Sequence, residues 1–364
     1  MEKKRSIKKI IIISAVAVLS IFILLVAGWW GLSVYLYDEN INVRCETYEP
    51  LMLRVEDFDG LNCTEYSFPS DKGQMLAGCL YSVGEDQHGI VVIAHGFGGG
   101  HNSYMDCAYY FAKNGYYVFA YDATGSDKSE GEGVGGVPQG VIDLEHAISF
   151  VEENSDIPDL PIVLFGHSWG GYSVCSVLNY HPEVSAVIEC SGFNRSSDMF
   201  ESGGKSQAGD AIYLMTPFIR IHESIKFGKY ATNTAMDGFE ASKCKVMIVH
   251  SEDDSVIEIG YGYDKYHEKY KDDPRFTFVH FEDRGHSDIF SDPDDTYVDE
   301  FDAEFYSWLK TLDYDYRAKE NKDRFIKDKA DYITENLDHA RWSGRLDEEM
   351  FKEFLDFYEQ AVLQ

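Results

Sequence analysis

Residues 160–178 read Leu-Pro-Ile-Val-Leu-Phe-Gly-His-Ser-Trp-Gly-Gly-Tyr-Ser-Val-Cys-Ser-Val-Leu, and this stretch decides the fold. Its first half, through Phe165, is apolar and partly β-branched, which is typical of a strand buried on both faces. From Tyr172 onward, apolar residues recur at a helical spacing. The stretch therefore predicts a strand that passes into a helix through a very tight turn.

The turn carries the pattern G-x-S-x-G, from Gly166 to Gly170, with Ser168 at its centre. Glycine has no Cβ atom, so the strand and the helix can approach closely on either side of the serine. Such a turn can hold a serine in a strained conformation with its hydroxyl exposed. The pentapeptide alone is a weak signal, but the strand before it and the helix after it favour Ser168 as a nucleophile.

Composition excludes several classes of protein. The 364 residues are 44% hydrophobic and 15% aromatic, which is enough for a large buried core. The net charge of -31 argues against binding to nucleic acid and against electrostatic adhesion to anionic lipid headgroups. We therefore expect a folded domain with no nucleic-acid partner.

The N-terminus has the pattern of a membrane anchor. Residues 1–9 are rich in lysine and arginine, and no charged residue occurs between Ile10 and Leu36. About 20 apolar residues suffice to cross a bilayer, and Trp29 and Trp30 suit its interface. The pattern predicts a cytoplasmic basic segment (1–9), a transmembrane signal anchor (10–37) and an extracytoplasmic remainder. A cleaved signal peptide is the alternative, although its apolar region is normally shorter and ends in a small-residue site.

Strand and helix patterns alternate beyond a tether at 38–63, and we place the main domain at 64–312. Apolar strand patterns occur at 66–68, 75–82, 89–94, 116–120, 185–189, 246–250 and 276–281, and helical patterns at 104–113 and 141–151. Alternation of this kind predicts an α/β fold with a mostly parallel central sheet and helices on both faces.

Two segments interrupt or extend the alternation. Residues from about 192 to 242 are rich in Met, Phe, Tyr and Ile, and we interpret them as a helical cap over the carboxyl ends of the strands. A plain excursion packed on the core is the alternative. Residues 313–364 form a C-terminal extension in which 321–340 and 347–363 are amphipathic. We expect a helical hairpin packed on the domain, with a module that binds an unidentified partner as the alternative.

Two further motifs follow the G-x-S-x-G turn. The strand at 246–250 runs into Asp253 and Asp254, and the strand at 276–281 precedes His286. An earlier strand ends at His95-Gly96, directly before Phe97. With the order serine, acid, histidine, these motifs resemble the α/β-hydrolase superfamily over about residues 64–312. The resemblance implies an α/β-hydrolase fold and a serine hydrolase activity.

The chemistry of such an enzyme assigns a role to each of these side chains. A serine hydroxyl is a poor nucleophile until a base takes its proton, and His286 is the candidate base for Ser168. An acid must fix the tautomer of that imidazole, and both Asp253 and Asp254 are placed to do so. In the superfamily the acid commonly follows a small residue by three positions, and Ser251 stands three residues before Asp254, which we therefore prefer.

A tetrahedral intermediate also needs hydrogen-bond donors for its oxyanion. The resemblance assigns this role to the backbone N–H groups of Phe97 and Trp169, and loss of one such donor can cost about 3 to 4 kcal/mol. Similar hydrolases use histidines like His95 and His167 for packing and hydrogen bonding. The glycine-rich loop at 125–136 lacks the Lys-Ser or Lys-Thr pair of a phosphate loop, and we expect no organic cofactor and no metal.

The sequence thus predicts a serine hydrolase that cleaves carboxylic ester bonds through an acyl-enzyme. An apolar cap suggests an acyl or aromatic substrate. A peptidase related to serine aminopeptidases and prolyl oligopeptidases is an alternative, as is a thioesterase or acyltransferase, because the fold does not fix the leaving group. A catalytically silent scaffold that holds a partner is an alternative from a different class.

The cysteines give one further hypothesis. The chain has seven, none in a C-x-x-C pattern, which argues against a zinc site and a dense disulfide framework. Cys45 and Cys63 lie outside the expected hydrolase core, so a single bridge between them is possible. We expect the others to be small buried hydrophobic residues.

Overall fold

The computed structural model describes residues 2–362, with side chains from residue 7 onward. Met1 and the side chains of residues 2–6, which belong to the predicted basic segment, lie outside the described residues. Leu363 and Gln364, at the end of the predicted C-terminal extension, do so as well.

A single eight-stranded sheet forms the centre of the domain. The strands are β1 (Asn62–Pro69), β2 (Met75–Ser82), β3 (Gly89–Ala94), β4 (Tyr116–Tyr121), β5 (Ile162–His167), β6 (Ala186–Cys190), β7 (Lys245–Ser251) and β8 (Phe276–Phe281). Their order across the sheet is β1-β2-β4-β3-β5-β6-β7-β8. β2 is antiparallel to both of its neighbours, and the strands from β4 to β8 pair in parallel. The predicted mostly parallel sheet is confirmed.

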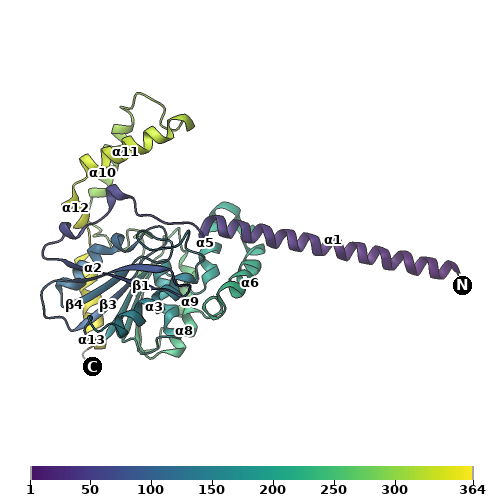
Figure 1. Ribbon diagram of the computed structural model, residues 1–364, viewed down its shortest axis with the longest axis horizontal. Helices are drawn as coiled ribbons and strands as arrows, with labels where there is room; N and C mark the ends of the chain where they lie inside the picture. The colour runs from purple at the N-terminus through teal and green to yellow at the C-terminus, as the bar shows by residue number, and fades with distance from the viewer. Residues whose placement is uncertain (1, 363–364) are drawn as a thin grey trace.

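Helices cover both faces of this sheet (Figure 1). They are α1 (Glu2–Ile41), α2 (Met105–Lys113), α3 (Gln139–Glu153), α4 (Trp169–Ser176), α5 (Ser196–Ala208), α6 (Thr216–Phe227), α7 (Lys229–Thr232), α8 (Ala235–Ala241), α9 (Tyr263–Tyr270), α10 (Tyr297–Leu309), α11 (Lys322–Asn336), α12 (His339–Ser343) and α13 (Glu348–Val362). One hydrophobic core joins the sheet to α3, α4, α8 and α9, and a second joins it to α2 and α13. Since central strands such as β3 are buried on both faces, they are continuously apolar.

The C-terminal helices differ from the expected hairpin. α13 packs on the sheet through an apolar stripe that includes Phe351, and the Tyr358 hydroxyl donates to the Leu164 carbonyl at 2.7 Å. α11 instead packs against α10, where Tyr332 stacks on Trp308 with ring centroids 4.5 Å apart. In Figure 1, α10 and α11 project away from the domain while α13 lies along the sheet. The reason is that α13 has a broad apolar face, whereas α11 buries a single residue.

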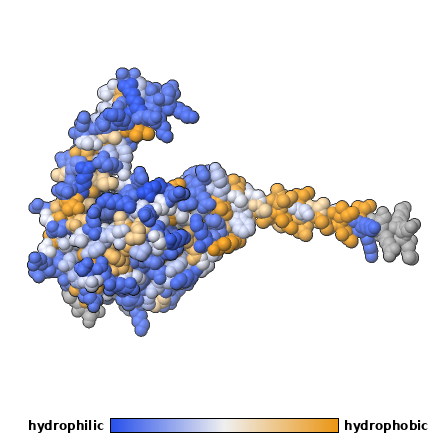
Figure 2. All heavy atoms as spheres, viewed as in Figure 1, coloured by the Kyte–Doolittle hydropathy of each residue, from blue (hydrophilic) through white to orange (hydrophobic). Residues whose placement is uncertain are grey.

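The apolar N-terminal helix is partly built into the domain. α1 is long and apolar enough to cross a membrane, and Figure 2 shows it as a hydrophobic rod leaving a mostly hydrophilic domain. Its last turns are different, because Ser33, Tyr37 and Ile41 are buried and the helix contacts α6 of the cap. The indole N–H of Trp29 donates to the Leu214 carbonyl of the cap at 3.0 Å. The helix therefore continues beyond the predicted anchor and ends inside the domain.

The predicted tether also packs on the domain. It contains two short 3-10 helices, η1 (Glu49–Leu51) and η2 (Val55–Asp57). Leu53, Phe58 and Leu61 are buried in the core that contains α2 and α13.

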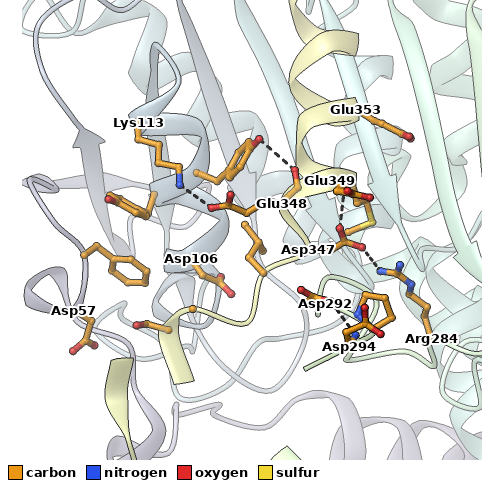
Figure 3. Close-up of a pocket in the computed structure, with 18 of the residues that line it drawn as sticks. Asp57, Asp106, Lys113, Arg284, Asp292, Asp294, Asp347, Glu348, Glu349 and Glu353 are labelled. Atoms are coloured by element: carbon orange, nitrogen blue, oxygen red, sulfur yellow. Dashed lines mark hydrogen bonds and ion pairs between the residues drawn. The ribbon is translucent and has the colours of Figure 1, made fainter. Parts of the chain in front are cut away.

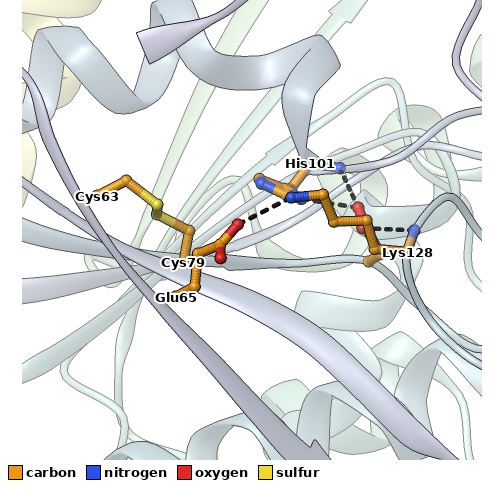
Figure 4. Close-up of a disulfide and its surroundings, with 6 residues drawn as sticks. Cys63, Glu65, Cys79, His101 and Lys128 are labelled. Carbon is orange, nitrogen blue, oxygen red and sulfur yellow. Dashed lines mark hydrogen bonds and ion pairs between the residues drawn. A yellow bond between two sulfur atoms is a disulfide. The ribbon is translucent and has the colours of Figure 1, made fainter.

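The disulfide hypothesis was wrong in its pairing. Cys63 is bonded to Cys79 across the β1–β2 hairpin, as Figure 4 shows. Cys45 is a free, buried cysteine whose backbone N–H donates to the Gly125 carbonyl at 2.9 Å. The hairpin brings strand β2 beside β1, whereas the segment around Cys45 is fixed to the glycine-rich loop. The other four cysteines are free and buried, as predicted.

Candidate active site

Ser168 stands at the carboxyl end of β5, directly before α4. Its φ of 57° and ψ of -116° form a conformation that residues with a Cβ atom rarely adopt, and such strain costs about 1 to 3 kcal/mol. The glycines around Ser168 are required because a Cβ atom at their positions would collide with neighbouring backbone atoms. A Cβ on Gly170 would lie 1.9 Å from the Ala94 carbonyl oxygen, and one on Gly166 would lie 2.3 Å from the Gly170 oxygen. The tight turn expected from the sequence is therefore present.

Three distant side chains meet at this turn. His286 Nε2 lies 3.0 Å from Ser168 Oγ, and His286 Nδ1 lies 2.7 Å from Asp254 Oδ2. They come from loops that follow β5, β7 and β8, whose carboxyl ends share one edge of the sheet. A carboxylate only accepts hydrogen bonds, so Nδ1 carries the proton and Nε2 can accept the serine hydroxyl.

Of the two neighbouring acids, the structure brings Asp254 to the imidazole. The other oxygen of Asp254 accepts the backbone N–H groups of Val256 and Ile257 at 2.9 and 2.8 Å. Burial by itself raises the pKa of this carboxyl, but hydrogen bonds from His250 and His286 outweigh burial and hold the pKa well below its usual value. Asp254 is therefore a fixed carboxylate.

Asp253 has a different position. One of its carboxylate oxygens accepts the Ser251 hydroxyl at 2.7 Å and the Gly285 backbone N–H at 2.8 Å. These bonds join the loop after β7 to the loop that carries His286. Asp253 thus holds the histidine loop and makes no hydrogen bond to the imidazole within the described residues.

Two buried groups behind Asp254 were missed by the sequence analysis. His250 Nε2 lies 2.9 Å from the Ile257 carbonyl and 3.3 Å from Asp254 Oδ2, the oxygen that also contacts His286. Glu189 is fully buried on β6, and its carboxylate has no hydrogen-bond partner among the described residues. Burial raises the pKa of Glu189 to about 7. In the sequence, the only sign of Glu189 and His250 was that each is a polar residue within an otherwise apolar strand.

His167 supports the histidine loop from the other side. Its Nε2 donates to the His286 carbonyl at 3.0 Å, so its Nδ1 accepts the Tyr104 hydroxyl at 2.7 Å. Burial, followed by the charge of His286, lowers the pKa of His167 to about 3. His95 Nε2 accepts the Ala123 backbone N–H at 2.9 Å. Both histidines make the hydrogen-bonding contacts expected of supporting residues.

The candidate oxyanion residues flank the serine. Trp169 is the first residue of α4, and its indole N–H donates to the Val137 carbonyl at 2.8 Å. Phe97 follows β3 and packs edge-on against Trp169 with ring centroids 5.9 Å apart. Phe97 and Ser168 line the same cavity.

This cavity has a volume of about 410 Å³ and is walled by segments from both ends of the chain. The tether contributes Thr47, Tyr48, Leu51 and Leu53, the loop after β3 contributes residues 96–100, and the C-terminal region contributes Trp342 and Arg345. None of the described residues of the cap (192–242) lines it. The segment is helical, as predicted, and contacts both α1 and the loop after β7, where Ser202 donates to the Val256 carbonyl at 2.7 Å.

A larger cavity of about 920 Å³ lies beside α13 (Figure 3). Nine of the 22 residues that line it are acidic, and neither Ser168 nor His286 belongs to its walls. Two ion pairs cross it: Lys113 with Glu348 at 2.9 Å, and Arg284 with Asp347 at 2.6 Å. These contacts attach α13 to α2 and to the histidine loop.

One group of described side chains has the spacing of metal ligands. Glu152, His181 and Glu183 place ligand atoms within 4.8 Å of one another. Both glutamates are exposed, and His181 Nδ1 already pairs with Glu183 at 2.7 Å. Since Glu183 precedes β6, this group lies at the end of the strands opposite Ser168.

Comparisons with known proteins agree with this architecture. Residues 85–236 match the serine aminopeptidase family S33. Over 134 residues the chain is 30% identical to the monoacylglycerol lipase of Mycolicibacterium smegmatis, covering 34% of this chain and 45% of that protein. The chain therefore spans about half the length of that curated relative. The solved structure of an esterase from Pyrococcus furiosus matches with a TM-score of 0.53 and 15% identity, covering 74% of this chain and 97% of that one.

Proposed function

Because the chain is an α/β-hydrolase by fold, we propose that it is a serine hydrolase that cleaves carboxylic ester bonds through an acyl-enzyme. The observation that carries this proposal is the continuous hydrogen-bonded series from Ser168 through His286 to Asp254. A nucleophile, a base and an acid that orients the base are the groups that acyl transfer requires.

The roles follow from the geometry. Ser168 Oγ attacks the ester carbonyl while His286 Nε2 takes its proton, and Asp254 stabilises the resulting imidazolium. The backbone N–H groups of Phe97 and Trp169 receive the oxyanion of the tetrahedral intermediate. When the intermediate collapses, His286 gives the proton to the departing alcohol. Water then attacks the acyl-enzyme by the same route, which releases the acid and restores the serine.

We favour ester cleavage over peptide cleavage as the proposed reaction for two reasons. The names of the curated relative and of the similar solved structure refer to a lipase and an esterase. The cavity at Ser168 also has apolar walls from Leu51, Leu53 and Phe290, which suit a short acyl or aromatic group. A peptidase is the second candidate because residues 85–236 match a serine aminopeptidase family.

We also propose that α1 anchors the enzyme in a membrane, with the N-terminus in the cytoplasm and the catalytic domain outside. The basic residues before Ile10 support this orientation. The Cys63–Cys79 disulfide supports it too, since disulfides persist mainly in oxidising compartments. Protease added to intact cells should digest the domain, and complete protection of the domain would contradict this orientation.

Active-site labelling tests the enzymatic proposal. The detergent-solubilised full chain should react with a fluorophosphonate probe, and Ser168→Ala should abolish both labelling and hydrolysis of 4-nitrophenyl esters. Ser103→Ala is a matched control, because Ser103 lines the same cavity without contacting His286. Equal labelling of the Ser168→Ala variant would overturn the proposal. Faster cleavage of aminoacyl nitroanilides than of esters would instead identify a peptidase.

A further inference from the structure

Arg345 is the one permanently cationic side chain among the described residues that line the cavity at Ser168. The chain as a whole has a net charge of -31, with 63 acidic residues against 32 lysines and arginines. In such an acidic chain, a positively charged side chain normally forms an ion pair with a carboxylate. The surroundings of Arg345 therefore decide whether its charge is available to a ligand.

Arg345 has no carboxylate partner within 4.0 Å among the described residues, unlike most arginines here. Seven of the ten arginines with described side chains form such ion pairs: Arg44, Arg54, Arg220, Arg275, Arg284, Arg324 and Arg341. The single side-chain hydrogen bond of Arg345 is a long one, 3.4 Å, to the Ser291 hydroxyl. Most of the donors of its guanidinium thus remain free for another group.

The guanidinium is nevertheless held in place. It lies 4.4 Å from the ring centre of Trp342, whose indole N–H donates to the Leu51 carbonyl at 2.9 Å. Stacking on an aromatic face fixes the plane of an arginine without using its hydrogen-bond donors. Arg345 is therefore oriented by a residue that is itself part of the cavity wall.

The backbone of Arg345 is joined to the segment that follows the catalytic histidine. The Arg345 carbonyl accepts the Asp292 N–H at 2.8 Å, and the Asp347 N–H donates to the Phe290 carbonyl at 2.7 Å. Between these two bonds, Ser291 and Leu346 form a β-bridge. Since this segment begins four residues after His286, the position of Arg345 is coupled to that of the catalytic base.

Asp106 is the acidic residue that lines the same cavity. Its carboxylate accepts the Cys107 backbone N–H at 2.7 Å in the first turn of α2. Burial raises the pKa of Asp106, which opposes its ionisation, while the charge of Arg345 acts in the other direction. The two side chains face the same space without forming an ion pair within 4.0 Å.

From this arrangement we propose that Arg345 is the recognition site for a carboxylate group carried by the substrate. The inference rests on the proposed esterase function and adds to it that the preferred ester is anionic. A guanidinium presents parallel N–H donors that match the two oxygens of a carboxylate. Bound in this way, the carboxylate would be anchored at Trp342 and Arg345 while the ester carbonyl reaches Ser168.

Two matched pairs of esters test the proposal. The acyl-side pair is mono-4-nitrophenyl glutarate and 4-nitrophenyl pentanoate, which share a five-carbon acyl chain. The alcohol-side pair is 4-carboxyphenyl pentanoate and phenyl pentanoate. For at least one pair we expect the wild type to have a kcat/KM at least about tenfold higher for the carboxylate ester, since a charge-assisted hydrogen bond supports a factor of that size.

Arg345→Gln should remove that preference, so that the ratio of kcat/KM for the carboxylate ester to kcat/KM for its neutral partner falls to within about twofold of one. Arg341→Gln is the matched control, because Arg341 lies on α12, pairs with Glu300 at 2.7 Å and does not line the cavity. Arg341→Gln should keep the wild-type ratio of kcat/KM between the carboxylate and the neutral esters. The proposal is overturned if neither pair shows a preference, or if the preference survives in Arg345→Gln.

A binding measurement separates this inference from the proposed activity. The same esters can be titrated calorimetrically into the Ser168→Ala variant, with and without Arg345→Gln, so that no turnover is needed. Tighter binding of a carboxylate ester that depends on Arg345 supports the recognition site even if hydrolysis proves independent of Ser168. Equal affinities with and without Arg345 would refute it, whatever the labelling experiment shows.

Discussion

Tyr37, in the last turns of α1, donates its hydroxyl to Glu223 Oε1 in the cap at 2.5 Å. The same hydroxyl accepts the Val137 backbone N–H at 3.0 Å, and Glu223 Oε2 accepts the Ser196 hydroxyl at 2.6 Å. Both partners are buried, so these bonds are protected from water. The helix that could cross the membrane is thus fixed to the cap and to Val137, directly after the glycine-rich loop, and the orientation of the domain relative to α1 is set by packing.

Tyr37→Phe should therefore destabilise the whole domain. The change leaves the Val137 N–H and one oxygen of Glu223 without a buried partner, which costs about 1 to 3 kcal/mol. Chemical unfolding of the detergent-solubilised chain measures this loss. Tyr35→Phe makes the same change two residues earlier at a side chain that is 58% exposed. We expect that control to differ from the wild type by less than about 0.5 kcal/mol, and equal losses in both variants would contradict the assignment.

Asp254→Asn and Asp253→Asn should have very different effects on turnover. An asparagine at 254 no longer holds His286 with its proton on Nδ1, and we expect kcat to fall by about 10³ to 10⁴. Asp253 contacts Gly285 of the histidine loop and not the imidazole. The kcat of Asp253→Asn should therefore fall by about tenfold or less. Steady-state hydrolysis of a 4-nitrophenyl ester gives both values. The opposite ranking would show that Asp253 orients the base.

Glu189→Gln should change how stability depends on pH. The native pKa of Glu189 is raised to about 7, above the ordinary value of 4.5 for an unfolded glutamate. The protonated side chain therefore stabilises the fold below about pH 4.5, and this contribution is lost as pH rises through about 7. A glutamine stays neutral, so the variant should gain up to about 3 kcal/mol relative to the wild type between pH 4.5 and pH 8.

Urea unfolding at several pH values measures that difference. Glu349→Gln removes one negative charge at an exposed site and controls for the change in net charge. Stability curves of the wild type and Glu189→Gln that run parallel across this range would show that the native carboxyl titrates normally.

The disulfide gives a prediction about both pairing and stability. A non-reducing digest of the exported protein should contain a peptide that joins Cys63 to Cys79. The two are 16 residues apart, and a loop of this size is worth about 3 kcal/mol in the chain-entropy model. Dithiothreitol should lower the unfolding free energy of the wild type by that order and leave a Cys63→Ala/Cys79→Ala variant unchanged. A peptide that joins Cys45 to Cys63 would contradict the observed pairing.

Local patterns were sufficient for much of the fold. Continuous apolar runs predicted the parallel strands, and the glycines around Ser168 predicted the tight turn, because both features depend on interactions between residues close in sequence. Ser168, Asp254 and His286 were named in advance from the resemblance to the α/β-hydrolase superfamily. They can meet because strands of one parallel sheet present their carboxyl ends at the same edge.

Features that depend on distant segments could not be predicted in the same way. Cys63 pairs with Cys79 because a hairpin places the two side by side. The position of a cysteine relative to the expected domain boundary does not show which other cysteine lies near it in space. The walls of the cavity come from Leu51 and Trp342, which lie 291 residues apart and are joined by one hydrogen bond. His250 and Glu189 looked like isolated polar residues until β6 and β7 were paired.

The amino-acid sequence by itself determined the α/β alternation and the serine turn, because periodicity and glycine sterics act over a few residues. Tertiary structure alone decided that α13 rather than α10 covers the sheet, that the cap contacts α1, and that Arg345 and Ser168 line the same cavity. Those outcomes depend on which apolar faces pack against one another in the folded chain. Many pairings satisfy the same local pattern, and only burial of the whole core selects among them.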